Sequence, residues 1–161
     1  MKKFLFSLFL LLITLAIQST LANYVMFKDV QLNLILLVVI SISLIFGEFS
    51  GIIFGFFAGI FSDFLFGHIL GLFAFVNMSC GFISLKVRRL FPSSHYIIPS
   101  FITIIITEIW IFLTYLISYF LGKQSISGNL ISNMIYQPLI NGLIILIIHP
   151  VIKKTSSLLK L

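Results

Sequence analysis

The sequence predicts an all-α integral membrane protein, with residues 1–161 forming a single transmembrane domain of six helices. Of its residues, 60% are hydrophobic and only 9% are charged, whereas about a quarter are charged in a typical soluble domain. The apolar residues are gathered in long runs, and the basic residues stand mostly at the ends of those runs. So few charged groups cannot cover a water-facing surface, so a soluble fold is excluded.

A helix needs roughly 17–25 mainly apolar residues to cross a bilayer. Six runs meet that requirement, and short polar stretches separate them. The predicted spans are approximately residues 4–22, 30–46, 49–66, 69–85, 96–121 and 130–149.

The ten Lys and Arg residues give a net charge of +6, and their placement predicts the topology. Six spans with a cytoplasmic N-terminus put eight of them inside: Lys2, Lys3, Lys86, Arg88, Arg89, Lys153, Lys154 and Lys160. Only Lys28 and Lys123 then lie outside. This bias follows the positive-inside rule and predicts that both termini are cytoplasmic. Nucleic-acid binding is not expected, because it needs a basic patch on a folded surface.

The first run has a second interpretation. Lys2 and Lys3, an apolar stretch and the small residues at 20–22 resemble a secretory signal with its cleavage site. The apolar stretch is longer than the 7–15 residues usual in such signals. We expect the span to be retained, and cleavage remains the alternative.

A row of glycines with one acid runs through the third span and the turn after it. Residues four apart lie on one face of a helix, and small residues there let helices approach closely in lipid. The row drifts about 40° per step, because 3.6 residues make a turn. It therefore predicts close packing, or partner binding, with more than one neighbour. Its members are Gly47, Gly51, Gly55, Gly59, Asp63, Gly67 and Gly71.

Asp63 is the acid in that row, near the outer end of the third span. An acid within a span is costly and usually faces protein or a cavity. It either docks a partner or ligand, or caps the fourth helix and bonds within the bundle, since Asp is a good capping residue.

Three stretches carry a resemblance to a known family. They are Gly55–Gly67, then Leu70–Ala74, and the stretch Gln18–Leu21 before a short outer loop. Their Gly-Phe, Gly, Asp, Gly, Leu-Gly order resembles the central signature of the rod shape-determining MreD family. One departure is that residues 32–34 lack the proline that often opens the family's second span.

The resemblance implies a non-enzymatic component of the bacterial inner membrane, acting in cell elongation, rod shape and peptidoglycan synthesis. Implied partners are MreC, and further MreB, RodA and a class B penicillin-binding transpeptidase. The family's fold is similar to the substrate-binding subunits of energy-coupling-factor vitamin transporters. Such a transporter subunit is therefore the alternative function.

Three polar residues fall near the centres of their spans: Asn77, Glu108 and Asn141. In hydrocarbon each needs a partner, and a shared cluster would satisfy all three. The cluster is either a set of hydrogen bonds between helices that fixes their register, or a small-molecule pocket near the midplane. Glu108 is the most expensive of the three to bury and is a functional-site hypothesis for that reason.

No catalytic or metal motif accompanies this polar group. Cys80 is the lone cysteine, and the three histidines show no metal-ligand spacing. No Ser or Cys is placed beside a base for nucleophilic catalysis. We expect no cofactor, no metal and no enzymatic activity.

Overall fold

The computed structural model describes residues 2–24, 26–27, 30–66, 69–90, 97–122 and 130–160, and these form six helices and one pair of short strands. In chain order the elements are α1 (Lys2–Tyr24), β1 (Met26–Phe27), β2 (Val30–Gln31), α2 (Leu34–Phe46), α3 (Glu48–Phe66), α4 (Leu72–Arg89), α5 (Ile98–Phe120) and α6 (Leu130–Leu158).

The polarity of the molecule is that of a membrane protein. Helices α3, α5 and α6 are long and apolar enough to cross a bilayer, and α1 and α2 contain shorter apolar stretches. Large apolar side chains such as Phe49 and Phe64 stand on the outside, about three-quarters exposed (73% and 72%). Many Ser, Thr and Asn side chains are instead buried in the interior. This distribution is favourable in lipid, because apolar side chains can contact lipid directly, whereas polar side chains need hydrogen-bond partners inside the protein.

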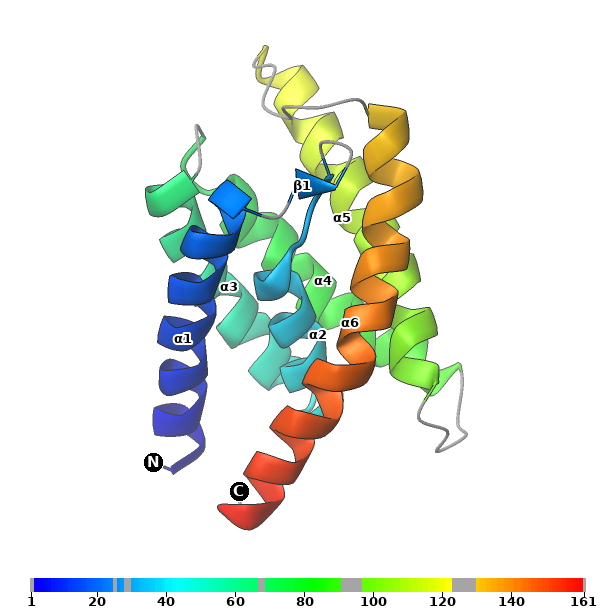
Figure 1. Cartoon of the computed structure of the whole chain (residues 1–161). Helices are drawn as coiled ribbons and strands as arrows, with labels where there is room; N and C mark the ends of the chain where they lie inside the picture. The colour runs from blue at the N-terminus through cyan, green and yellow to red at the C-terminus, as the bar shows by residue number, and fades with distance from the viewer. Residues whose placement is uncertain are drawn as a thin grey trace.

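Successive helices run in alternate directions, and the N and C labels lie at the same end of the bundle (Figure 1). Helix α2 lies at the centre and packs against α1, α3, α4 and α6. Every residue from Ile35 to Leu44 is buried. A helix that is apolar around its whole circumference is expected in such a position.

Two hydrophobic clusters meet at α2. One side of it, including Val39 and Ile42, packs with residues of α1, α3 and α6. The other side, including Leu36 and Ile40, packs with α4 and α5. The central helix therefore joins the two halves of the bundle.

The start of the second span differs from its prediction. Val30 and Gln31 form β2, which pairs antiparallel with β1, and α2 begins only at Leu34. The reason is local, because the Asn33 side chain accepts a hydrogen bond from the Leu36 backbone N–H at 3.0 Å and caps the helix. This pair of two-residue strands corrects the predicted start of the second span at residue 30, whereas the six helices agree with the predicted all-α fold.

The last helix is longer than predicted. It continues through Pro150 to Leu158, although the predicted span ended at residue 149. Proline removes one backbone N–H, but helices in membranes tolerate it when neighbouring groups compensate. The added turns carry Lys153 and Lys154 to the end of the bundle where both termini lie.

Candidate functional site

The glycine row forms a seam between α3 and α4. We call Gly51, Gly55 and Gly59 of α3, with Gly81 of α4, the glycine seam. A Cβ added to Gly55 would lie 2.5 Å from the Asn77 carbonyl oxygen. One added to Gly59 would overlap the Ala74 Cα, and one added to Gly81 would overlap the Gly51 carbonyl. The two backbones therefore touch directly, as the small-residue spacing predicted.

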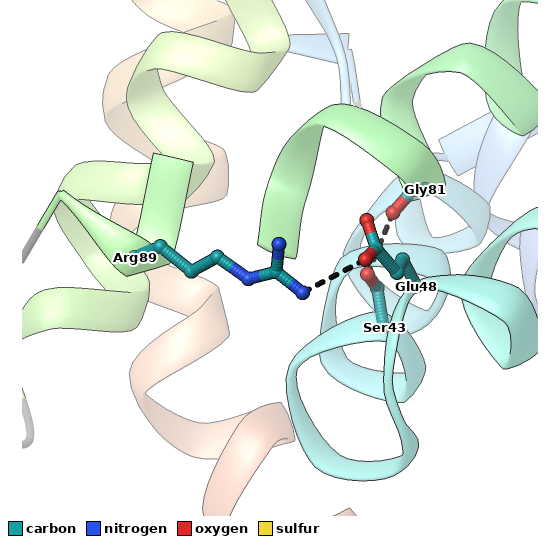
Figure 2. Close-up of polar contacts among 4 residues, drawn as sticks. All are labelled: Ser43, Glu48, Gly81 and Arg89. Carbon is teal, nitrogen blue, oxygen red and sulfur yellow. Dashed lines mark hydrogen bonds and ion pairs between the residues drawn. The ribbon is translucent and has the colours of Figure 1, made fainter. Parts of the chain in front are cut away.

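The seam also reaches a third helix. A Cβ on Gly51 would lie 2.5 Å from the Cβ of Ser43 in α2. The Ser43 hydroxyl donates a hydrogen bond of 2.6 Å to the Gly81 carbonyl (Figure 2). Helix α3 thus meets more than one neighbour closely, which is the consequence expected from the drift of the row.

The two outermost described glycines of the row lie outside the seam. Gly47 has φ +100° and Gly71 has φ +91°, and an added Cβ at either position would meet nothing within 4 Å. They are at helix ends, where a left-handed φ favours glycine. Neither glycine therefore makes a close helix contact in the described chain, and partner binding by them stays a prediction. Gly67 lies outside the described residues.

Asp63 caps α4 from α3. One carboxylate oxygen accepts from the Gly71 and Ala74 backbone N–H groups at 2.9 and 3.2 Å, and the other accepts from Phe73 at 2.9 Å. The side chain is 2% exposed. The first N–H groups of a helix have no partner within it, and an anion there also interacts favourably with the helix dipole. Of the two interpretations of Asp63, the structure shows the capping one.

Asn77 lies beside the glycine seam and joins α4 to α5. Its side-chain oxygen accepts a hydrogen bond of 2.9 Å from the Trp110 indole N–H. The Trp110 ring is stacked on Phe73, with ring centroids 5.8 Å apart and planes 11° from parallel. Trp110 is thus a packing residue, as its central place in the fifth span suggests.

The other two polar midplane residues have separate surroundings. The Asn141 side-chain nitrogen lies 3.3 Å from the Thr107 hydroxyl and joins α6 to α5. Glu108 is half-buried, and no hydrogen bond to its carboxylate is found among the described residues. Instead of sharing one hydrogen-bonded cluster with Glu108, Asn77 bonds to Trp110 and Asn141 bonds to Thr107.

Basic residues gather at the end of the bundle where both termini lie. The Arg89 guanidinium forms an ion pair of 2.8 Å with Glu48 at the start of α3 (Figure 2). Arg88 donates a hydrogen bond of 2.6 Å to the Leu44 carbonyl of α2. The Lys3 ammonium lies 5.8 Å from the centre of the Phe46 ring. The first two contacts fix the end of α4 against the turn between α2 and α3, and the third joins the start of α1 to the end of α2.

A family model described as rod shape-determining protein MreD matches residues 1–157, nearly the whole chain. The chain belongs to the MreD family. No curated protein and no solved structure gave a significant match. The similarity to energy-coupling-factor transporter subunits therefore stays a prediction.

In this MreD-family chain, the residues that carry the family resemblance build one structural unit. Gly55 and Gly59 allow the close contact of α3 with α4, and Asp63 caps the start of α4. The Gln18 amide, in the third stretch of the resemblance, accepts from the Leu34 N–H at 2.8 Å and donates to the Leu32 carbonyl at 2.9 Å. It ties the end of α1 to the start of α2.

Sequence reasoning missed Gly81 and Ser43. Gly81 stands alone in α4, outside the four-residue row, and a single glycine carries little signal. The only available sign was its place in the middle of a predicted span, where glycine is costly unless something approaches closely.

Within the described residues, no group of three or more His, Cys, Asp or Glu side chains is placed to hold a metal ion.

Proposed function

We propose that this MreD-family chain is a non-enzymatic, multi-pass scaffold of the bacterial inner membrane that acts in cell elongation. It serves rod-shape maintenance and peptidoglycan synthesis by binding other membrane proteins, first among them an MreC-like protein. MreB, RodA and a class B penicillin-binding transpeptidase are the further partners. The observation that carries this proposal is the family match over residues 1–157.

The orientation we propose puts both termini in the cytoplasm. In support, the N and C ends lie together in Figure 1, which is required if all six helices cross the membrane. The basic residues Lys86, Arg88 and Arg89, at the end of α4, lie at that same end. A concentration of Lys and Arg on one side is characteristic of the cytoplasmic face.

A scaffolding role is supported by how the buried polar groups are used. Both Asp63 oxygens bind the start of α4, and Asn77 binds Trp110 across a helix contact. Because α4 fills the glycine seam, partners would bind other surfaces of a bundle whose shape the seam maintains.

The test is depletion of the protein in its native cells, combined with recovery of its partner. Depletion should turn rods into spheres, and wild-type protein should restore the rods and co-purify with an MreC-like protein. The Gly59→Val variant should fail in both assays, whereas the control Gly142→Ala should behave as wild type. Rod-shaped cells after full depletion, with no MreC-like protein recovered, would contradict the proposal. A vitamin recovered with the protein would favour the transporter subunit instead.

A further inference from the structure

An open groove lies between α1 and α3 at the basic end of the bundle. Its volume is about 270 Å³. It is formed by the first turns of α1, the last residue of α2 and the first turns of α3. Its lining includes Lys3, Ser7, Leu8, Ser50, Ile53 and Phe57.

The lining divides into a polar end and an apolar body. Lys3, Ser7 and Ser50 supply an ammonium group and two hydroxyls close to the end of the bundle. Leu8, Ile53 and other apolar side chains continue the groove along the helices. This division suits a ligand with a polar, charged head and a hydrocarbon chain.

The positive charge of Lys3 at the polar end of the groove favours a ligand with a negatively charged head group. Among the residues that the structure describes, no carboxylate lines the groove, so no described acid neutralises Lys3 there. The nearest acid along α3 is Glu48, which is already paired with Arg89 at 2.8 Å. The Ser50 hydroxyl donates to the Phe46 carbonyl at 3.4 Å. The head that complements Lys3 and the Ser7 hydroxyl is an anion such as a phosphodiester.

The size of the groove selects the kind of chain. The groove runs between α1 and α3, and side chains of both helices line its walls. A volume of about 270 Å³ holds several groups the size of a water molecule. A stretch of a single acyl chain has that volume.

We propose that this groove binds an anionic phospholipid, with one acyl chain lying between α1 and α3 and the phosphate held by Lys3. The lipid comes from the bilayer leaflet at the basic end of the bundle, so it is present wherever the protein is inserted. It fills the space between two helices that the protein's own side chains leave open. This inference does not depend on the proposed scaffolding function.

Native mass spectrometry of the detergent-purified full chain, titrated with phosphatidylglycerol or phosphatidylcholine, tests the charge. Wild-type protein should retain phosphatidylglycerol preferentially. Lys3→Gln should weaken phosphatidylglycerol binding about fivefold, the typical effect of one basic residue at an anionic surface, and leave phosphatidylcholine unchanged. The matched control, Lys154→Gln on the exposed part of α6, should behave as wild type. Equal retention of both lipids by wild type, or equal behaviour of the two variants, would overturn the proposal.

A second pair of variants tests the groove itself. Ile53→Trp fills it and should reduce the binding of both lipids, whereas Leu143→Trp, on the exposed face of α6, should not. If Ile53→Trp lowers the unfolding temperature, Leu8→Trp is used in its place, because it fills the groove from the α1 side. Undiminished lipid binding by a folded groove-filling variant would refute the site. A two-chain mass that such a variant abolishes would assign the groove to a second copy, and would refute the lipid proposal too.

Discussion

The α3–α4 and α5–α6 contacts are both close, but they are made of different parts of the chain. In the first, each added Cβ at Gly55, Gly59 or Gly81 would meet the backbone of the facing helix. In the second, a Cβ at Gly142 would meet the side chain of Ile104, with the nearest atom at 2.8 Å. A side chain can adopt another rotamer, whereas the backbone of a helix can move only if the whole helix moves.

This difference gives the glycines of the α3–α4 hairpin a role that no other residue type can fill. Backbone contact in lipid requires glycine at fixed positions, and the start of α4 requires a hydrogen-bond acceptor that lipid cannot supply. The α5–α6 pair is held by side-chain bonds such as Ser100 to the Gly142 carbonyl at 2.6 Å. Many sequences can provide contacts of that kind.

The largest effect is expected from Gly55→Leu. The new side chain would have to enter the space of the Asn77 carbonyl, so α3 and α4 would separate. We expect loss of more than about 4 kcal/mol of unfolding free energy, and little folded protein. Size-exclusion chromatography and unfolding in detergent measure this. Gly142→Leu is the matched control, and an equal loss in both variants would remove the distinction between the two contacts.

Asp63→Ala should have the next largest effect. It leaves three backbone N–H groups at the start of α4 without their acceptor, which costs about 2–3 kcal/mol. Asp63→Asn keeps one oxygen and should lose roughly half as much. Unfolding of both variants in detergent gives the comparison. Wild-type stability of Asp63→Ala would show that the cap does not stabilise the hairpin.

The bond between Asn77 and Trp110 should contribute less. A double-mutant cycle with Asn77→Ala and Trp110→Phe should give a coupling free energy of about 0.6–1.7 kcal/mol, the range of hydrogen bonds between membrane helices. Additive single effects would mean that the bond contributes nothing. The pair Asn77→Ala and Thr114→Val provides a control cycle, because no bond joins Asn77 to Thr114.

The smallest effect is expected at the ion pair of Glu48 and Arg89. The Arg89 side chain is 64% exposed, so water screens the pair. Glu48→Gln should change the unfolding free energy by less than about 1 kcal/mol, and added salt should reduce even that. Thermal unfolding at low and high salt measures it. A loss as large as that of Asp63→Ala would contradict this ranking.

The sequence predicts the helices well and their side-chain contacts poorly. Apolar runs and glycine spacing are properties of one segment, and they located six helices and the seam of α3. The partners of Asn77 and Asn141 depend on how neighbouring helices are rotated about their axes, which no single segment specifies. Trp110 and Thr107 were therefore not foreseen as their partners.

Some element ends were predicted and others were missed, and the start of α2 was missed although its cap, Asn33, is local. The α3 helix ends at Phe66 as predicted. The start of α4 was placed too early, because the acceptor that fixes it, Asp63, comes from another helix. The groove between α1 and α3 was not foreseen, since it depends on the gap between two helices.

The glycines of α3 stabilise the bundle by backbone contact with α4. The unfolding free energy of Gly59→Ala in detergent, measured beside that of Gly142→Ala, tests this contact. We expect a loss of about 3 kcal/mol for Gly59→Ala, where the methyl meets the Ala74 backbone. For Gly142→Ala we expect a loss of less than about 1 kcal/mol, because the Ile104 side chain can move. Equal changes in the two variants would contradict it.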